Sequence, residues 1–511
     1  MRQAARSKGS RTQVSGVTSL PAPIGGLNSR DSLAAMAQTD AVVMENFFPA
    51  TTECVLRKGY VNHVTGITGQ VETLMVYSAN TEKMFAIAGG KVYDVSSSGT
   101  VGSAALTGLT NSRWQYCNFS TAGGNFLSMG NGVDAPRLYD GTSWSTPAIT
   151  GVTTTKLNTP IVFKNRQYFI EKGTLKTWYL PVQSIAGAAN KVDMSAVAKL
   201  GGYIVAHETW TIDAGTGVDD YYVAITNHGE VIVYQGTDPS DAATWALKGV
   251  WRIGAPVGDR CMFKLAGDIL VICQDGLMPL GAALQSSRVN PRVALTDKIQ
   301  WSISEDVTTY GANFGWQIFY YPSENQLWMN IPQATGGTQY QYAMNTISRS
   351  WGKYTGYNAN TFQLFNEEAY FGGDGFVAKA WFGNSDAGLN IRGKCLQAFS
   401  TYGAAGRYKR FTMTRPIFRA TGTPSVKGSM NYDFNVDITP TDLNFAPNPK
   451  AVWGSAIWGQ AIWGGGYSIY QDWQGVSGLG YYAAPQIQAV TNGVDVRWVS
   501  TDVVFEQGQI L

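Results

Sequence analysis

The stretch that decides the fold is Tyr221–Leu280, which reads YYVAITNHGEVIVYQGTDPSDAATWALKGVWRIGAPVGDRCMFKLAGDILVICQDGLMPL. Two apolar runs end in GEVIVYQG and DGLMPL, and a segment that contains Trp lies between them. Runs of Val, Ile and Tyr bounded by Gly and Asp are typical of short strands joined by tight turns. This pattern indicates a blade of a β-propeller. No cluster of catalytic residue types accompanies it, so the stretch points to architecture and assembly rather than chemistry.

The composition of the chain agrees with a β protein. Gly accounts for 58 of 511 residues, aromatic residues for 12% and charged residues for only 14%, against a charged share of about 25% in average domains. Exposed helix turns need more charged residues than this, whereas Gly, Thr, Tyr, Trp and Val suit turns and pleated sheets. We therefore expect an all-β fold.

Weak echoes of one pattern recur along the chain. A β-run with a large residue appears at seven positions, at intervals of 35 to 64 residues: Tyr93, Tyr139, Tyr179, Tyr234, Met278, Tyr342 and Val377. A four-stranded propeller blade takes roughly 40–50 residues. The spacing predicts a β-propeller of six or seven blades over residues 66–385; a row of hairpins that form sandwiches or barrels is the alternative.

The two ends of the chain have a different texture. Residues 1–65 are predicted to form an extended N-terminal arm, with a short helix over 40–47 and a first strand over 55–60. Residues 386–511 are predicted to form an additional C-terminal β region, which could also help to close the propeller. The echo VWGSAIWGQAIWGGG (452–466) fits neither a helix face nor strand alternation, so we expect a loop that buries its Trp residues against a neighbour or on itself.

Basic residues are concentrated in two blocks. Residues 1–30 hold five Lys and Arg and residues 387–432 hold eight, with no acid in either block, whereas residues 31–386 carry a net charge of −6. Such blocks indicate contact with a polyanion or an acidic subunit, or a solvated face. The strongest candidates alternate with aromatic residues and are predicted to contact DNA or a neighbouring subunit: Arg407, Lys409, Arg410, Arg415 and Arg419. Positions 407, 409, 415 and 419 have the same parity and are predicted to share one strand face.

No motif predicts an enzyme, a metal site or a cofactor. Residues 388–395 (GLNIRGKC) have phosphate-loop spacing, but Cys395 replaces the Ser or Thr that would bind magnesium. The three His residues lie far apart in sequence, and Asp140-Gly141 is predicted to be a hairpin turn with Trp144 packed beneath it. The five Cys residues have no C-x-x-C pair and are expected to be reduced core thiols in a protein that folds inside a cell. Neither a signal peptide nor a membrane helix is expected.

Four segments, taken in order, resemble the tail nozzle and packaged-DNA stabilisation proteins of P22-type short-tailed bacteriophages: residues 25–60, 229–260, 265–284 and 320–381. The resemblance implies a β-propeller subunit of a ring, commonly of six copies, that retains packaged double-stranded DNA and passes it at ejection. It also implies a virion location after assembly in the host cytoplasm. The implied partners are a head-to-tail adaptor and a distal plug, needle, spike or fibre.

A second function remains open from the residues themselves. Trp and Tyr faces stack on sugars, and Tyr139–Trp144 (YDGTSW) has a faint similarity to the Asp-box turn of sialidase propellers. A carbohydrate-binding or sialidase-like propeller would need convergent carboxylates or arginines in one pocket.

Overall fold

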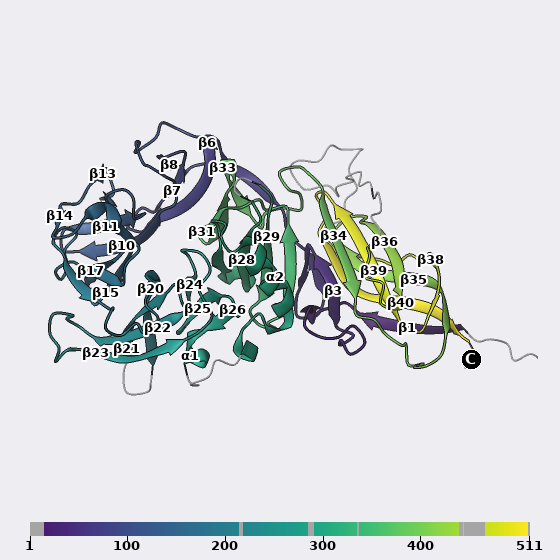
Figure 1. Cartoon of the computed structure of the whole chain (residues 1–511). Coiled ribbons are helices and arrows are strands. Elements are labelled where there is room, and N and C mark those ends of the chain that lie inside the picture. Colours follow the sequence, from purple (N-terminus) through teal and green to yellow (C-terminus); the bar gives the residue numbers. More distant parts are fainter. Residues whose placement is uncertain are drawn as a thin grey trace, which may run out of the picture. The chain divides into compact units, whose positions relative to one another are not determined.

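The computed structural model describes residues 15–213, 218–284, 291–334, 337–438, 443 and 466–508. Strands dominate it, which confirms the all-β prediction. The chain divides into two compact units (Figure 1). The propeller unit comprises residues 58–349 and 353–388, and the sandwich unit comprises residues 1–57, 350–352 and 389–511.

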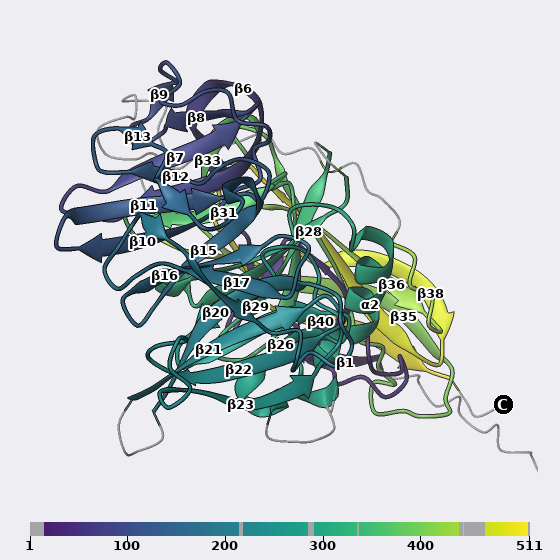
Figure 2. The same ribbon diagram turned by 60° about the vertical axis from the view of Figure 1, so that its left-hand side comes forward.

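The propeller unit is a succession of antiparallel sheets, each formed by strands that follow one another along the chain (Figure 2). The first three sheets are β6–β7–β8 (Tyr60–Tyr77, Lys83–Ala88, Lys91–Asp94), β10–β11–β12–β13 (Gln115–Thr121, Gly124–Gly130, Arg137–Tyr139, Trp144–Ser145) and β15–β16–β17–β19 (Leu157–Phe163, Arg166–Glu171, Lys176–Tyr179, Asn190–Asp193). The next two are β20–β21–β22–β23 (Ile204–Asp213, Val218–Thr226, Glu230–Gly236, Trp245–Arg252) and β24–β25–β26 (Met262–Leu265, Asp268–Cys273, Gly276–Pro279). Two more follow: β27–β28–β29–β30 (Gln317–Tyr321, Gln326–Pro332, Gln339–Asn345, Trp351–Thr355) and β31–β32–β33 (Thr361–Phe365, Glu368–Gly372, Asp374–Ala380).

The first strands of these sheets contact one another in chain order, β6, β10, β15, β20, β24, β27 and β31, and β31 contacts β6 again. The eighteen-residue strand β6 serves two sheets. Its N-terminal part pairs with β33, from Tyr60 opposite Ala380 to Gln70 opposite Asp374. Its C-terminal part pairs with β7. The closed succession of sheets resembles a β-propeller.

The repeated large residues explain why each sheet packs on the next. Each of the seven echoes lies on the third strand of its sheet, from Tyr93 on β8 to Val377 on β33. Tyr139 packs with Met75 and Phe85 of the preceding sheet. Tyr179, on the next sheet along, packs in a core that also contains Tyr222 of the following one. Burial of these large side chains between neighbouring sheets provides the hydrophobic stabilisation that a single sheet cannot supply.

Two short helices interrupt this pattern after β26: α1 (Leu280–Ala283) and α2 (Gln300–Tyr310). Asp306 of α2 is buried and accepts a hydrogen bond from the hydroxyl of Tyr342 at 2.9 Å. Burial raises the pKa of this carboxyl group despite that hydrogen bond. The interaction ties α2 to β29.

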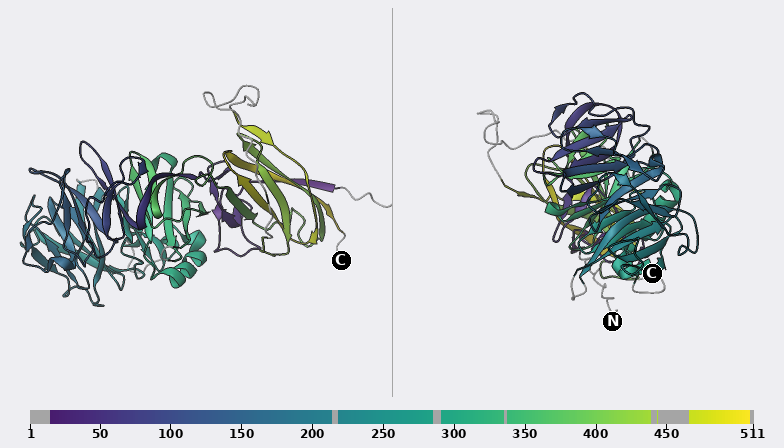
Figure 3. Two further views of the ribbon diagram at one scale, coloured as in Figure 1. Left: turned by 90° about the horizontal axis from the view of Figure 1, so that it is seen from above. Right: turned by 90° about the vertical axis from the view of Figure 1, so that its left-hand side faces the viewer.

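The sandwich unit consists of two antiparallel sheets with a common core. The first sheet contains β1 (Ser15–Pro21), β4 (Phe47–Pro49), β5 (Cys54–Leu56), β35 (Lys409–Ala420), β37 (Ser468–Tyr470), β38 (Gln474–Gly480) and β40 (Val496–Gln507). The second contains β2 (Gly26–Leu27), β3 (Asp40–Glu45), β34 (Ile391–Gln397), β36 (Ser425–Tyr432) and β39 (Ala483–Thr491). Phe411 and Phe505 of the first sheet pack on Met430 and Ala483 of the second. Figure 3 shows β1, in purple, beside the C-terminal strands, in agreement with its pairing to β40.

Several sequence-based expectations differ from this architecture. The predicted helix over 40–47 is wrong: Asp40–Glu45 is strand β3, and Val43 and Met44 pair with β34. The β-branched pair Val42-Val43 favours this extended backbone. Residues 15–56 are built into the sandwich unit rather than forming a separate arm, and the strand that pairs with β33 comes from β6 instead of residues 386–511. The Trp-Gly echo lies outside the described residues except for Gly466.

Candidate functional site

The propeller unit encloses an axial cavity of about 510 Å³, to which the first strand of every sheet contributes. Thr73, Tyr116 and Ile161 line it from β6, β10 and β15. Ile318 of β27 and Gln363 of β31 line its other side. The lining is a mixture of apolar side chains and a few polar groups, as in many ligand pockets, and the volume lies within their usual range of about 300–1,000 Å³.

Arg260 crosses this cavity. It lies just before β24, yet its Nη2 donates hydrogen bonds to the Glu72 carbonyl at 3.0 Å and to Thr73 Oγ1 at 2.9 Å, both on β6. Its Nε donates to Gln115 Oε1 at 3.3 Å, on β10. In the closed order of contacts, β27 and β31 lie between β24 and β6, and β15 and β20 lie between β24 and β10. The guanidinium therefore joins sheets that are not neighbours.

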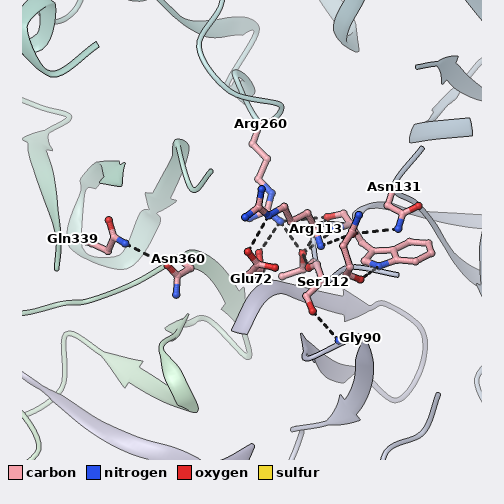
Figure 4. A network of polar contacts seen from close by, with 11 residues as sticks. Glu72, Gly90, Ser112, Arg113, Asn131, Arg260, Gln339 and Asn360 are labelled. Atoms are coloured by element: carbon pink, nitrogen blue, oxygen red, sulfur yellow. Dashed lines mark hydrogen bonds and ion pairs between the residues drawn. The ribbon is translucent and has the colours of Figure 1, made fainter. Parts of the chain in front are cut away.

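A second cation, Arg113, lies beside Arg260 (Figure 4), and both guanidinium groups lie over one aromatic ring. The guanidinium groups of Arg113 and Arg260 lie 4.6 and 5.0 Å from the centre of the Phe314 ring. Arg113 is paired with Glu72 at 2.9 Å. Burial lowers the pKa of Arg260 to about 10, so the group remains protonated at neutral pH.

A hydrogen bond separates the axial cavity from a second one. The hydroxyl of Tyr116 donates to Gln363 Oε1 at 3.0 Å, and both residues line a further cavity of about 550 Å³ with Glu82 and Glu367. Burial raises the pKa of Tyr116 to about 12, which keeps the donor protonated. This hydrogen-bonded pair therefore lines both cavities.

His207 of β20 is a neutral, buried partner at the cavity wall. Its Nδ1 lies 2.6 Å from the Tyr222 hydroxyl and its Nε2 lies 2.6 Å from the Thr159 carbonyl. Burial lowers the pKa of His207 to about 4. A proton on Nε2 satisfies both contacts, because the imidazole then donates to the carbonyl and accepts from the hydroxyl.

The basic strip predicted from sequence lies on β35, except for Arg407 just before it, and its residues do not share one face. Lys409 is buried, and its Nζ donates to the carbonyls of Arg407 and Tyr481, each at 2.8 Å. Arg407 and Arg410 are exposed. The predicted parity is wrong because a β-bulge between Phe411 and Met413 shifts the alternation by one residue.

Beyond the bulge the other two candidates lie on the outer side of the first sandwich sheet, but both are ion-paired. Arg415 Nε contacts Asp502 at 2.9 Å, and Arg419 contacts Glu53 at 3.4 Å. Arg415 also lies over the ring of Trp473, at 4.6 Å from its centre. Asp502 therefore balances the charge of Arg415, whereas Glu53 is shared between Arg419 and Arg497.

The same side of this sheet exposes apolar side chains in register with the arginines. Val17 of β1 and Met413 of β35 both oppose Val504 of β40, and Leu479 of β38 opposes Arg410. We call this surface the arginine face and define it by Val17, Arg410, Met413, Arg415, Arg419, Ile469, Trp473 and Leu479. Ile469 opposes Arg419 and is 66% exposed; Val17 is 63% exposed. The arginine face is thus apolar and aromatic, and two of its three arginines, Arg415 and Arg419, are paired with acids.

The remaining sequence candidates have structural roles. Asp140 accepts hydrogen bonds from the backbone amides of Thr142 and Ser143, which lower its pKa to about 2. It closes the β12–β13 turn, and Trp144 packs on Tyr139 at 5.1 Å, as predicted. Residues 391–395 belong to strand β34. All five Cys residues are free thiols, and Cys261 and Cys273 are buried as predicted.

Two features are absent from the described residues. No group of three His, Cys, Asp or Glu that could hold a metal ion occurs within them. None of the helices that they form is long and apolar enough to cross a membrane.

Comparisons with known proteins give fold-level similarity at most. No protein family matches the chain, and no curated protein does. The solved structures that are similar include the BBS1 N-terminal domain in complex with ARL6, at 9% identity and a TM-score of 0.39 over 63% of this chain and 97% of that one. The computationally designed Ika8 protein is similar at 11% identity and a TM-score of 0.36, over 63% of this chain and all of that one.

Sequence reasoning did not single out Arg260, Thr159 or the Tyr116–Gln363 pair. One sequence feature could have marked Arg260 as a site residue: it is a charged residue at the start of an apolar run, GDRCMFKL. No such feature marks Thr159, because its position at the cavity depends on the closure of the sheets.

Proposed function

We propose that the protein is a structural subunit of the tail of a short-tailed bacteriophage. Copies would form a ring-shaped nozzle that retains packaged DNA and passes it during ejection, between a head-to-tail adaptor and a distal plug, needle, spike or fibre. This proposal places the protein in the virion after assembly in the host cytoplasm. The resemblance of residues 25–60, 229–260, 265–284 and 320–381 to tail nozzle proteins motivates it.

We further propose that the propeller has seven blades. The support is the order in which its first strands contact one another, together with the position of every sequence echo on a third strand. In this reading β6 provides the outer strand of the last blade and the inner strand of the first. A strand shared in this way closes the circle of blades without leaving a long free sheet edge.

The observation that carries the assembly proposal is the arginine face. Protein interfaces are enriched in aromatic residues, Met and Arg, and their buried cores are depleted of unbalanced charge. The arginine face matches this composition, since Trp473 and Met413 accompany arginines paired with acids. Phosphate binding requires cations that can neutralise DNA, so among the two alternatives for this strip we favour a subunit contact.

The axis of a single propeller is a poor path for DNA. Arg260 and the Tyr116–Gln363 pair cross it, whereas a duplex is ~20 Å wide, consistent with its groove dimensions. The conduit of the proposed nozzle would therefore form between copies. A propeller whose axis is filled by side chains would act as a rigid wall element.

Native mass spectrometry and negative-stain electron microscopy of the full-length protein test the proposal. We expect a closed ring with a pore wide enough for duplex DNA. The resemblance to tail nozzle proteins implies about six copies in that ring. Monomers at all concentrations, also in the presence of the adaptor, would refute the assembly.

Variants of the arginine face test its role in the ring. Ile469→Asp and Leu479→Asp introduce charges at exposed apolar positions and should dissociate the ring without lowering the melting temperature. Val182→Asp is the matched control, because Val182 is 51% exposed and belongs to the propeller unit instead of the sandwich unit. Intact rings in both variants would exclude the arginine face as the contact.

A further inference from the structure

We propose that the axial cavity of the propeller unit binds a small organic acid, whose carboxylate contacts Arg260 and whose apolar body packs between the first strands. This inference does not depend on the tail function, because it concerns one copy of the propeller unit. It rests on the polar atoms, the backbone and the charges of the cavity wall.

Two polar atoms of the wall are buried without a hydrogen-bond partner among the described residues: Nη1 of Arg260 and Oγ1 of Thr159. Buried polar groups are almost always hydrogen-bonded, and an orphan next to a cavity calls for an occupant. The other nitrogens of the Arg260 guanidinium are fully used by Gln115 and β6. One N–H edge of a cation is therefore left for an acceptor, and a carboxylate is the strongest acceptor available.

Backbone strain coincides with one of these atoms. Thr159 has a φ of +45°, a left-handed conformation that a β-branched residue rarely adopts. It lies in the bulge between Asn158 and Ile161, where β15 departs from regular pairing with β16. Strain of this kind persists where surrounding structure fixes it and concentrates at ligand sites. Here the bulge places Thr159 at the cavity wall, with its carbonyl on His207 and its hydroxyl buried.

The charges around the cavity select the ligand class. Glu208, which also lines the cavity, is already paired with Lys264 at 3.4 Å. His207 is neutral because burial lowers its pKa. Asp259 is exposed at the rim and would repel a second acidic group. The charges of these residues therefore favour a ligand with a single carboxylate.

Apolar residues make up much of the rest of the wall, and the amides of Gln317 and Gln363, which share it, are already hydrogen-bonded within the propeller unit. Leu74, Ile161, Met262, Ile318 and Leu364 contribute side chains from five first strands. A hydrocarbon or aromatic body is therefore favoured over a sugar, whose hydroxyl groups would lose their water here without replacement. Phenylacetate and hexanoate are suitable probes.

The test uses the full-length protein and four probes: phenylacetate, hexanoate and their neutral amides, phenylacetamide and hexanamide. Isothermal titration calorimetry and saturation-transfer NMR measure binding. We expect saturable binding of at least one acid and binding of the matched amide that is about tenfold weaker or more, because the amide lacks the charge-assisted contact. Equal affinity for acid and amide, or no saturable signal up to about 10 mM acid, would overturn the proposal.

Three variants locate the site. Arg260→Gln should abolish acid binding, whereas Arg113→Gln, at a guanidinium on the same Phe314 ring but outside the cavity wall, should retain it. Thr159→Gly should relieve the left-handed strain and preserve the melting temperature, yet weaken acid binding about fivefold through loss of the hydroxyl. Thr159→Gly keeps the test valid if Arg260→Gln fails to fold. Undiminished acid binding in Thr159→Gly or in folded Arg260→Gln would place the ligand elsewhere.

Discussion

Protonation of His207 should destabilise the propeller unit in mild acid. His207 is buried, and its pKa in the folded protein is about 4 against 6.5 for the free side chain. The unfolded chain therefore binds a proton between pH 6.5 and 4 that the folded chain does not bind. The stabilisation is fully present above pH 6.5 and is lost as the pH falls through this window.

The size of this effect follows from the pKa difference. A shift of 2.5 pKa units, at 1.36 kcal/mol per unit, corresponds to about 3 kcal/mol by pH 4, and integration gives about 2 kcal/mol by pH 5. Either is a substantial fraction of the stability of a domain, which is roughly 5–15 kcal/mol.

Guanidinium chloride unfolding at pH 7.5, 6, 5 and 4, followed by tryptophan fluorescence, measures the effect. His207→Gln removes the titrating group and should reduce the loss of unfolding free energy between pH 7.5 and 5 by about 2 kcal/mol. At pH 7.5 the variant should be less stable by about 1–3 kcal/mol, because the Tyr222 hydroxyl loses its partner. His228→Gln is the control, since His228 is exposed, and should keep the wild-type pH dependence. If wild type and His207→Gln lose stability in parallel, the assignment of the acid effect to His207 is refuted.

Three further substitutions test the packing of the propeller unit by denaturant unfolding. Arg260→Gln should lower the free energy of unfolding by about 2–4 kcal/mol, because it leaves carbonyl groups and Thr73 unsatisfied at the axis. Arg113→Gln is the control and should lower it by under about 1 kcal/mol, since the Arg113 side chain is 43% exposed. Equal losses in the two variants would contradict the crossing role of Arg260. Gly59→Ala should destabilise by more than about 3 kcal/mol, because a Cβ would lie 1.8 Å from the Ser385 carbonyl oxygen, whereas Gly102→Ala, with no atom within 4 Å of its Cβ, should change stability by under about 0.5 kcal/mol. Trp328→Ala should cost about 3–5 kcal/mol, since Trp328 is fully buried against the rings of Phe319 and Phe362; a loss below 1 kcal/mol would show that the aromatic core repacks.

The repeated sheets could be recognised from sequence because their third strands are buried on both faces. Residues such as Tyr139 and Tyr234 lie between neighbouring sheets, and this environment demands a large apolar or aromatic side chain at nearly constant intervals. The stretch Tyr221–Leu280 proved to span the end of one sheet and the whole of the next. The repeated pattern of apolar strands and turns in this stretch therefore reflects successive sheets, and the stretch is not a single blade.

The candidate site could not be predicted in the same way. The cavity wall takes only two to four residues from each first strand, so no local pattern marks it. The basic strip on β35 was visible as composition, but one extra residue at Thr412 reversed the facing of Lys409 relative to Arg415. A bulge is set by the pairing partner β40, which lies some 90 positions further along the chain.

The sandwich unit is built from both ends of the polypeptide, with the propeller inserted between them. Strand β1 pairs with β40, the last strand of the chain. During synthesis β1 must therefore remain without this partner until β40 has been made. A prematurely terminated product could complete most sheets of the propeller but never the arginine face. Only polypeptides that extend through β40 would then compete for places in an oligomer, so the synthesis of this strand acts as a quality check on assembly.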